Sequence, residues 1–117
     1  MKLNALTSKL FGVAAAAAAL SLSAPAVAAM SEADIEPFLK KAGCFKCHAI
    51  DKTKKGPSYK KIAEKYKGKP DGEEKIAKNL TTSPKVKLED GTEEEHKEIE
   101  LKDKADLKIV TQWILSR

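Results

Sequence analysis

The spacing of apolar and polar residues beyond position 30 predicts helices and gives no convincing strand. Apolar side chains recur every three or four positions between Ser31 and Gly43, which is typical of an amphipathic helix. Ser31 with Asp34 forms a capping box at its start, and Gly43 is suited to its end. The same spacing predicts a second helix that opens at Pro57 and stops at Gly68.

Two further helices are expected after aspartates that can cap them. Asp71 precedes a short apolar stripe, and Asp103 precedes a longer one that runs to the C-terminus. Between Pro84 and Lys102 lies a polar segment, with DGTEEEH at its centre, which has no clear periodicity and is expected to be a long loop. Three to four helices and no domain boundary predict a single all-α domain.

The first 29 residues have the order of a secretory signal peptide. Two lysines without an acidic residue come first, an apolar run over 11–22 follows, and small residues end the stretch. The apolar run is shorter than the roughly 20 residues that span a bilayer, so an uncleaved anchor is the less favoured alternative. We expect cleavage after Ala28 or Ala29, which leaves a periplasmic domain over 30–117 without a membrane span.

Charge is unevenly distributed along the mature domain. The whole chain carries a net +5, and removal of the two leader lysines leaves +3. Residues 40–69 hold eleven lysines against two acids, whereas residues 89–100 hold seven acids against one lysine. Such a dipole is ordinary for a solvated surface and can also steer a charged protein partner. Near balance and scarce arginine argue against a nucleic-acid partner.

The only two cysteines lie in the stretch GCFKCHAI, as Cys44 and Cys47 with His48 directly after them. A disulfide across so short a loop would stabilise little and would leave the histidine unexplained. A zinc site would have to crowd these three ligands together with His96, and a redox dithiol of the thioredoxin type needs a βαβ unit.

Covalent haem attachment uses every residue of this motif at its observed spacing. Two thiols that are two residues apart can each form a thioether to one vinyl group of the same porphyrin. The histidine that follows is then placed to coordinate the iron. We therefore expect one covalent haem c, tethered by Cys44 and Cys47 with His48 as the proximal iron ligand.

The run FLKKAGCFKCHAIDKTKKGPSYKKIAEKY over 38–66 resembles the small class I c-type cytochromes of bacterial periplasms, the group of cytochromes c-551 and c-8. The last helix, with Trp113, also looks like that family's last helix. The resemblance implies a small class I cytochrome c fold, with three to four helices wrapped around the haem. It further implies that the Pro57 carbonyl accepts a hydrogen bond from His48, and that Tyr59 and Trp113 line the haem pocket or its propionate edge.

One departure from the family concerns the second axial ligand. The family's usual ligand is a methionine before the last helix, and no methionine follows Met30 here. His96 lies 17 residues before Trp113, close to where that methionine would fall, and is the candidate distal ligand. The alternative is a surface histidine in an acidic loop. Ligation by His48 and His96 would lower the redox potential relative to a methionine–histidine pair.

We therefore predict that the protein is a monomeric electron carrier that serves redox protein partners and is not an enzyme. Electrons would pass through an exposed haem edge that is rimmed by lysines and docks on acidic surfaces: Lys46, Lys52, Lys54 and Lys55. The alternative is a haem protein whose sixth position is open, or weakly held by His96, Asn79 or a lysine, and which binds a small gas or reduces peroxide.

Overall fold

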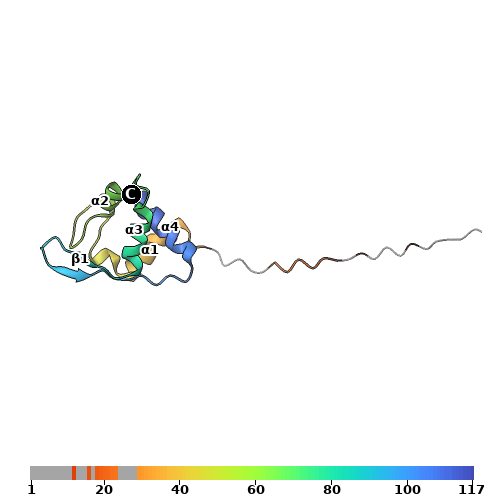
Figure 1. Ribbon diagram of the computed structural model, residues 1–117. Coiled ribbons are helices and arrows are strands. Elements are labelled where there is room, and N and C mark those ends of the chain that lie inside the picture. The colour runs from red at the N-terminus through yellow and green to blue at the C-terminus, as the bar shows by residue number, and fades with distance from the viewer. Residues whose placement is uncertain (1–11, 13–15, 17, 24–28) are drawn as a thin grey trace, which may run out of the picture.

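The computed structural model of the protein describes residues 12, 16, 18–23 and 29–117. Within them, four α-helices and a short 3-10 turn form one domain, with a two-stranded hairpin before the last helix (Figure 1). Most of the leader expected at 1–29 lies outside the described residues, so its removal stays a prediction. No helix of the described part is long and apolar enough to cross a membrane.

Helix α1 (Glu32–Ala42) has the caps that its sequence predicts. The Ser31 amide donates to the Asp34 carboxylate at 3.1 Å. At the other end, Gly43 takes a left-handed conformation with φ of 84°, and its amide donates to the Lys40 carbonyl at 3.0 Å. This conformation favours glycine, and it turns the chain directly into the 3-10 turn η1 (Cys44–Lys46).

Helix α2 (Tyr59–Tyr66) begins two residues later than expected from Pro57. Ser58 is the capping residue, because its hydroxyl accepts the Lys61 amide at 3.1 Å. Pro57 therefore stays outside the helix, and its carbonyl is available to a partner elsewhere in the fold.

Helices α3 (Gly72–Thr81) and α4 (Lys104–Leu115) follow the predicted apolar stripes. Asp103 caps α4 as expected, since its carboxylate accepts the Ala105 amide at 3.0 Å. Asp71 does not cap α3 through its side chain. Its carboxylate instead pairs with Lys75, one turn into the helix, at 2.9 Å.

The polar segment after α3 is not a plain loop, which corrects the expectation that the chain has no strands. Strand β1 (Lys85–Lys87) pairs antiparallel with strand β2 (Glu93–Glu95). The turn between them is closed by the Leu88 amide, which donates to the Thr92 carbonyl at 2.8 Å, and by Gly91 with φ of 86°. The all-α class still describes the rest of the fold.

The core forms where α4 packs against α1, α2 and α3. Met30 packs against this core, and its backbone nitrogen donates to the Asp106 carboxylate on α4 at 2.9 Å. The segment after the hairpin is anchored by Ile99, whose amide donates to the Leu80 carbonyl at 2.9 Å. The core side chains share near-complete burial: Ile35, Leu39, Tyr59, Ile76, Leu80, Ile99, Val110, Trp113 and Ile114.

Candidate haem site

The two cysteines are presented by one tight turn between α1 and the following loop. The amides of Cys47 and His48 both donate to the Cys44 carbonyl, at 3.2 and 3.0 Å. One turn of the chain therefore carries Cys44, Cys47 and His48. Both thiols are free and half-buried in the structure. Burial raises the pKa of the Cys44 thiol, against the opposing effect of the Lys97 ammonium.

His48 is held by the hydrogen bond that the resemblance implies. Its Nδ1 lies 2.6 Å from the Pro57 carbonyl oxygen, which can only accept, so Nδ1 carries the proton. The other ring nitrogen then keeps its lone pair. Burial lowers the pKa of His48 and outweighs the opposing effect of the Pro57 hydrogen bond. The lowered pKa favours the neutral imidazole, which is the form that binds metals.

Gly56 provides the space that this arrangement needs, and sequence reasoning missed its role. A methyl group on Gly56 would lie 2.9 Å from Cε1 of His48. Its amide also donates to the Cys47 carbonyl at 2.8 Å, which ties the loop to the cysteine turn. A glycine directly before Pro57 in the family-like run was the available signal.

His96 faces His48 across the site. It follows β2 directly, and its amide donates to the Pro84 carbonyl at 2.8 Å. The two imidazole ring centres are 6.1 Å apart, with 43° between the ring planes. Nδ1 of His96 is buried and has no hydrogen-bond partner among the described residues. The structure therefore brings together two histidines that are far apart in the sequence.

The separation of His48 and His96 matches the separation expected for two histidines that bind one haem iron. A histidine nitrogen lies about 2 Å from a bound metal, so two rings that share one ion from opposite sides have centres about 6 Å apart. The observed 6.1 Å between His48 and His96 fits one iron between them. Among the described residues, no group of three or more His, Cys, Asp or Glu side chains is arranged to hold a metal ion.

Aromatic residues surround the proximal side. The Tyr59 ring lies 5.3 Å from the His48 ring, 5.6 Å from Phe45 and 5.5 Å, edge-on, from Trp113. Tyr59 is only 3% exposed, and burial raises its pKa well above the ordinary value, so the phenol stays protonated. Tyr59 therefore touches the candidate ligand, and Trp113 supports Tyr59 from the core. Their contact with haem stays a prediction.

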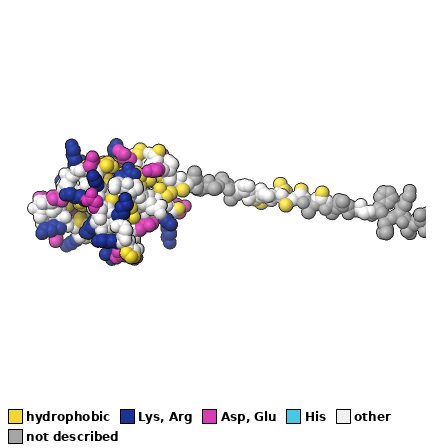
Figure 2. Space-filling view, turned by 90° about the horizontal axis from the view of Figure 1, so that it is seen from above, with side chains coloured by type: hydrophobic (Ala, Val, Ile, Leu, Met, Phe, Trp, Pro, Cys, Tyr) yellow, Lys and Arg dark blue, Asp and Glu magenta, His cyan; other side chains and the backbone are white. Residues whose placement is uncertain are grey.

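Lysines gather around the cysteine turn. Lys54 donates from Nζ to the Phe45 carbonyl at 2.6 Å, and the Lys40 ammonium lies 5.5 Å from the Phe45 ring centre. The Lys97 ammonium would lie 3.1 Å from a Cβ on Gly43. Of the lysines expected at this edge, Lys54 makes a direct contact, and Lys40 and Lys97 are additional members. Figure 2 shows lysine and arginine side chains over much of one face of the domain, with acidic side chains between them.

The geometry of this candidate haem site agrees with the sequence similarity of the chain to known proteins. The sequence profile described as Cytochrome c matches residues 22–117. The chain belongs to the cytochrome c family. Haem c, one per chain and covalently bound, is the cofactor of this family, and its members carry electrons rather than catalyse reactions on substrates.

Individual relatives place this cytochrome c among the class I proteins. Cytochrome c-551 of Pseudomonas aeruginosa is 40% identical over 47 residues, which are 40% of this chain and 45% of that protein, so the match spans just under half of its length. Cytochrome c2 of Rubrivivax gelatinosus is 33% identical over 88 residues, 64% of this chain and 87% of that protein. The crystal structure of the class 1 cytochrome MtoD from Sideroxydans lithotrophicus ES-1 superposes with a TM-score of 0.69, at 46% identity, over 75% of this chain and 97% of that one.

Proposed function

We propose that the protein is a periplasmic electron carrier whose haem iron is held between His48 and His96, with Cys44 and Cys47 as the thioether anchors. The observation that carries the proposal is the 6.1 Å separation of the two rings. Haem supplies a one-electron ferric/ferrous couple when bound. The periplasmic location rests on the leader-like sequence of residues 1–29.

The protein's own groups set the properties of such a centre. The Pro57 carbonyl fixes the ring and tautomer of His48 and makes its free nitrogen a better donor. A second imidazole in place of the family's methionine favours ferric iron, so the potential should lie below that of a methionine–histidine cytochrome.

Optical and electron paramagnetic resonance spectra of His96→Ala beside wild type test the ligation. Wild type should show a six-coordinate, low-spin bis-nitrogen signature that the variant loses. His96→Met should regain a sixth ligand and raise the potential. Glu100→Ala, an exposed change four residues further along, is the matched control and should leave the spectrum unchanged. An unaltered low-spin spectrum in His96→Ala would remove His96 from the site.

A second candidate function is binding of a small gas or peroxide at a weakly held sixth position. The observation that favours it is the difference between the two histidines. His48 is fixed by Pro57, whereas Nδ1 of His96 has no partner among the described residues. Carbon monoxide added to the reduced protein separates the functions, because a firmly six-coordinate haem resists it. Rapid and tight binding to wild type would favour the second function.

The lysines at the cysteine turn support docking of an acidic redox partner at that edge. Lys46 is exposed in the turn itself, between the two cysteines. Lys46→Glu should slow electron transfer with an acidic partner at low salt, and the difference should shrink as salt rises. Lys108→Glu makes the same charge change on the α4 face toward α3 and serves as the control. Equal rates for wild type and Lys46→Glu at low salt would place docking elsewhere.

A further inference from the structure

The hairpin that carries His96 has an unusual composition, since every position of β2 is a glutamate. Glutamate is disfavoured in strands, and adjacent like charges repel each other. An isolated two-stranded hairpin is at best marginally stable in water. Something besides strand propensity must therefore hold this pairing.

The register shows what opposes the glutamates. Lys85 lies opposite Glu95, and Lys87 lies opposite Glu93. Because alternate residues of a strand point to the same side, both lysine–glutamate pairs share one face of the hairpin. Directly opposite charges of unlike sign stabilise an antiparallel pair, and like charges destabilise it by similar amounts.

The register also decides where His96 points. The amide of His96 donates to the Pro84 carbonyl, so the histidine continues the ladder one step beyond the Lys85–Glu95 pair. A slip of one residue would send each side chain of β2 to the opposite face. Such a slip would carry the His96 ring away from His48.

The far end of the hairpin is tied to the proximal side of the site. The Glu89 amide, in the turn, donates to the Lys55 carbonyl at 3.0 Å. Lys55 lies two residues before Pro57, which holds His48. The hairpin thus runs from the proximal loop to the distal histidine, and its charged pairs lie between these two anchor points.

We propose that Lys85, Lys87, Glu93 and Glu95 are positioning residues whose paired charges fix the hairpin register and so hold His96 at the haem iron. The inference rests on the proposed ligation by His96 and adds the residues that maintain it.

Charge reversal on one strand tests the proposal in the haem-loaded protein. In Lys85→Glu/Lys87→Glu, both attractive pairs become repulsive, and the affinity of the reduced protein for carbon monoxide should rise on the order of tenfold. The amide of His96, which is bonded to Pro84, should exchange its hydrogen faster by a similar factor. Adding Glu93→Lys/Glu95→Lys restores opposite pairs with exchanged signs and should return both quantities to near their wild-type values.

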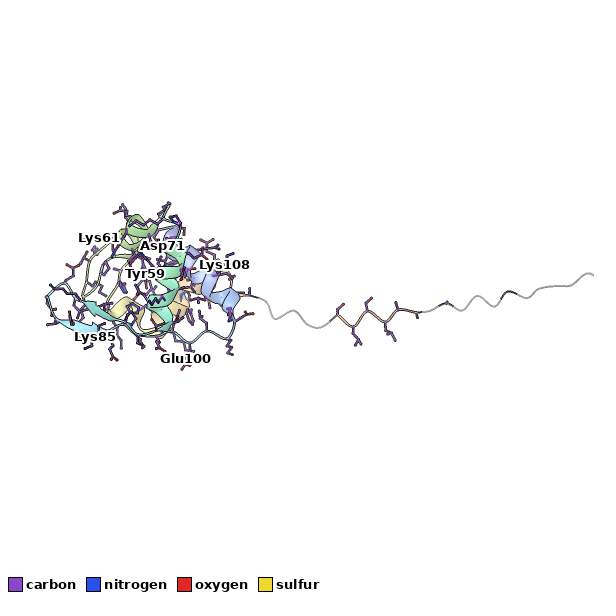
Figure 3. The ribbon with its side chains drawn as sticks, in the orientation of Figure 1. Tyr59, Lys61, Asp71, Lys85, Glu100 and Lys108 are labelled. Carbon is purple, nitrogen blue, oxygen red and sulfur yellow. The ribbon has the colours of Figure 1, made fainter. Side chains whose placement is uncertain are left out.

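Lys108→Glu is the control for a charge change alone, since Lys108 lies on α4 at the opposite end of the domain from Lys85 (Figure 3). The milder Lys85→Gln/Lys87→Gln removes attraction without adding repulsion, and should show a smaller change in the same direction if the reversed protein does not fold.

The outcomes distinguish the positioning role of the charged pairs from the ligation by His96. Unchanged carbon monoxide affinity and hydrogen exchange in the reversed and neutral variants, together with a lost low-spin signature in His96→Ala, would overturn the positioning role and leave the ligation standing. Failure of the four-residue exchange to restore the wild-type values would show that charge pairing is not the cause. A His96→Ala protein with an unchanged spectrum would instead overturn the ligation itself.

Discussion

Gly56→Ala is the most direct perturbation of the proximal histidine. The new methyl group would lie 2.9 Å from Cε1 and 3.3 Å from Nδ1 of His48. Carbon atoms in contact normally lie about 3.5–4.0 Å apart, so the imidazole must move by roughly 0.6 Å or more. Gly56 is not among the glycines with a positive φ, so the new strain comes from crowding: mainly of the His48 ring, and also of the Cys47 carbonyl oxygen, which would lie 3.3 Å from the new methyl group.

The expected effect is a rise in redox potential. Movement of the ring stretches the 2.6 Å hydrogen bond from Nδ1 to the Pro57 carbonyl. A hydrogen bond of this kind contributes about 0.5–1.5 kcal/mol net. It makes the imidazole a stronger donor and favours ferric iron, so its loss favours ferrous iron. If the whole hydrogen-bond energy stabilises ferric over ferrous iron, its loss raises the redox potential by about 20–65 mV, at 59 mV for each tenfold change in the equilibrium constant.

Spectroelectrochemical titration of the two holoproteins measures this shift. The control is Gly68→Ala, where φ is 77° and no atom lies within 4 Å of the new Cβ. That substitution should cost about 1–2 kcal/mol of stability through its left-handed backbone, with no change in potential. A folded, fully haem-loaded Gly56→Ala protein with the wild-type potential would refute the reasoning.

Substitutions at three further positions test the packing, each by thermal unfolding of the holoprotein. In Gly72→Ala, the new Cβ would clash with the Tyr66 carbonyl oxygen. The substitution should therefore lower the melting temperature, even though alanine is the better helix former by about 1 kcal/mol. An unchanged or higher melting temperature would contradict the contact. Asp106→Ala removes the acceptor of the Met30 backbone nitrogen and should cost about 1 kcal/mol, or about 4–8 °C. Asp106→Asn keeps an acceptor oxygen and should lose less. Equal losses in the two variants would argue against the bond. Leu39→Ala leaves a cavity at a fully buried position and should cost about 2–5 kcal/mol, so a loss below 1 kcal/mol would mean that the core there is looser than the structure shows.

The helices were predictable because their signals are local. Asp103 caps α4, and Gly43 ends α1, each through contacts within four residues. The start of α2 was placed too early, because both Pro57 and Ser58 are typical of helix starts and only the structure shows which one caps.

The hairpin was missed, although Val86 and Leu88 alternate with Lys85 and Lys87 and the pair Asp90 and Gly91, which is typical of hairpin turns, follows them. The signal is weak because β1 is three residues long and β2 contains only glutamates. In the structure, lysines of β1 lie opposite glutamates of β2, and the Glu89 amide contacts the Lys55 carbonyl, which joins segments more than thirty positions apart. The role of Gly56 is equally non-local in origin, since it depends on how closely the loop passes the His48 ring.

The candidate haem site also has one part that local sequence determines and another that depends on contacts between distant segments. Cys44, Cys47 and His48 follow from one local motif, and the structure places them on one turn. The approach of His96 to His48 was suggested only by its spacing from the last helix, and depends on the register of the hairpin.

The closeness of the two imidazole rings also bears on how the chain is restrained. Residues 48 and 96 lie 48 positions apart in the sequence, and α2, α3 and the hairpin all fall between them. An iron bonded to both rings would act as a cross-link that closes this loop. By the chain-entropy relation used for covalent bridges, a loop of this length corresponds to on the order of 4 kcal/mol of restraint on the unfolded chain. Without the distal bond, nearly half of the polypeptide would lose this restraint in the unfolded state, and the folded state would be less stable by a similar amount.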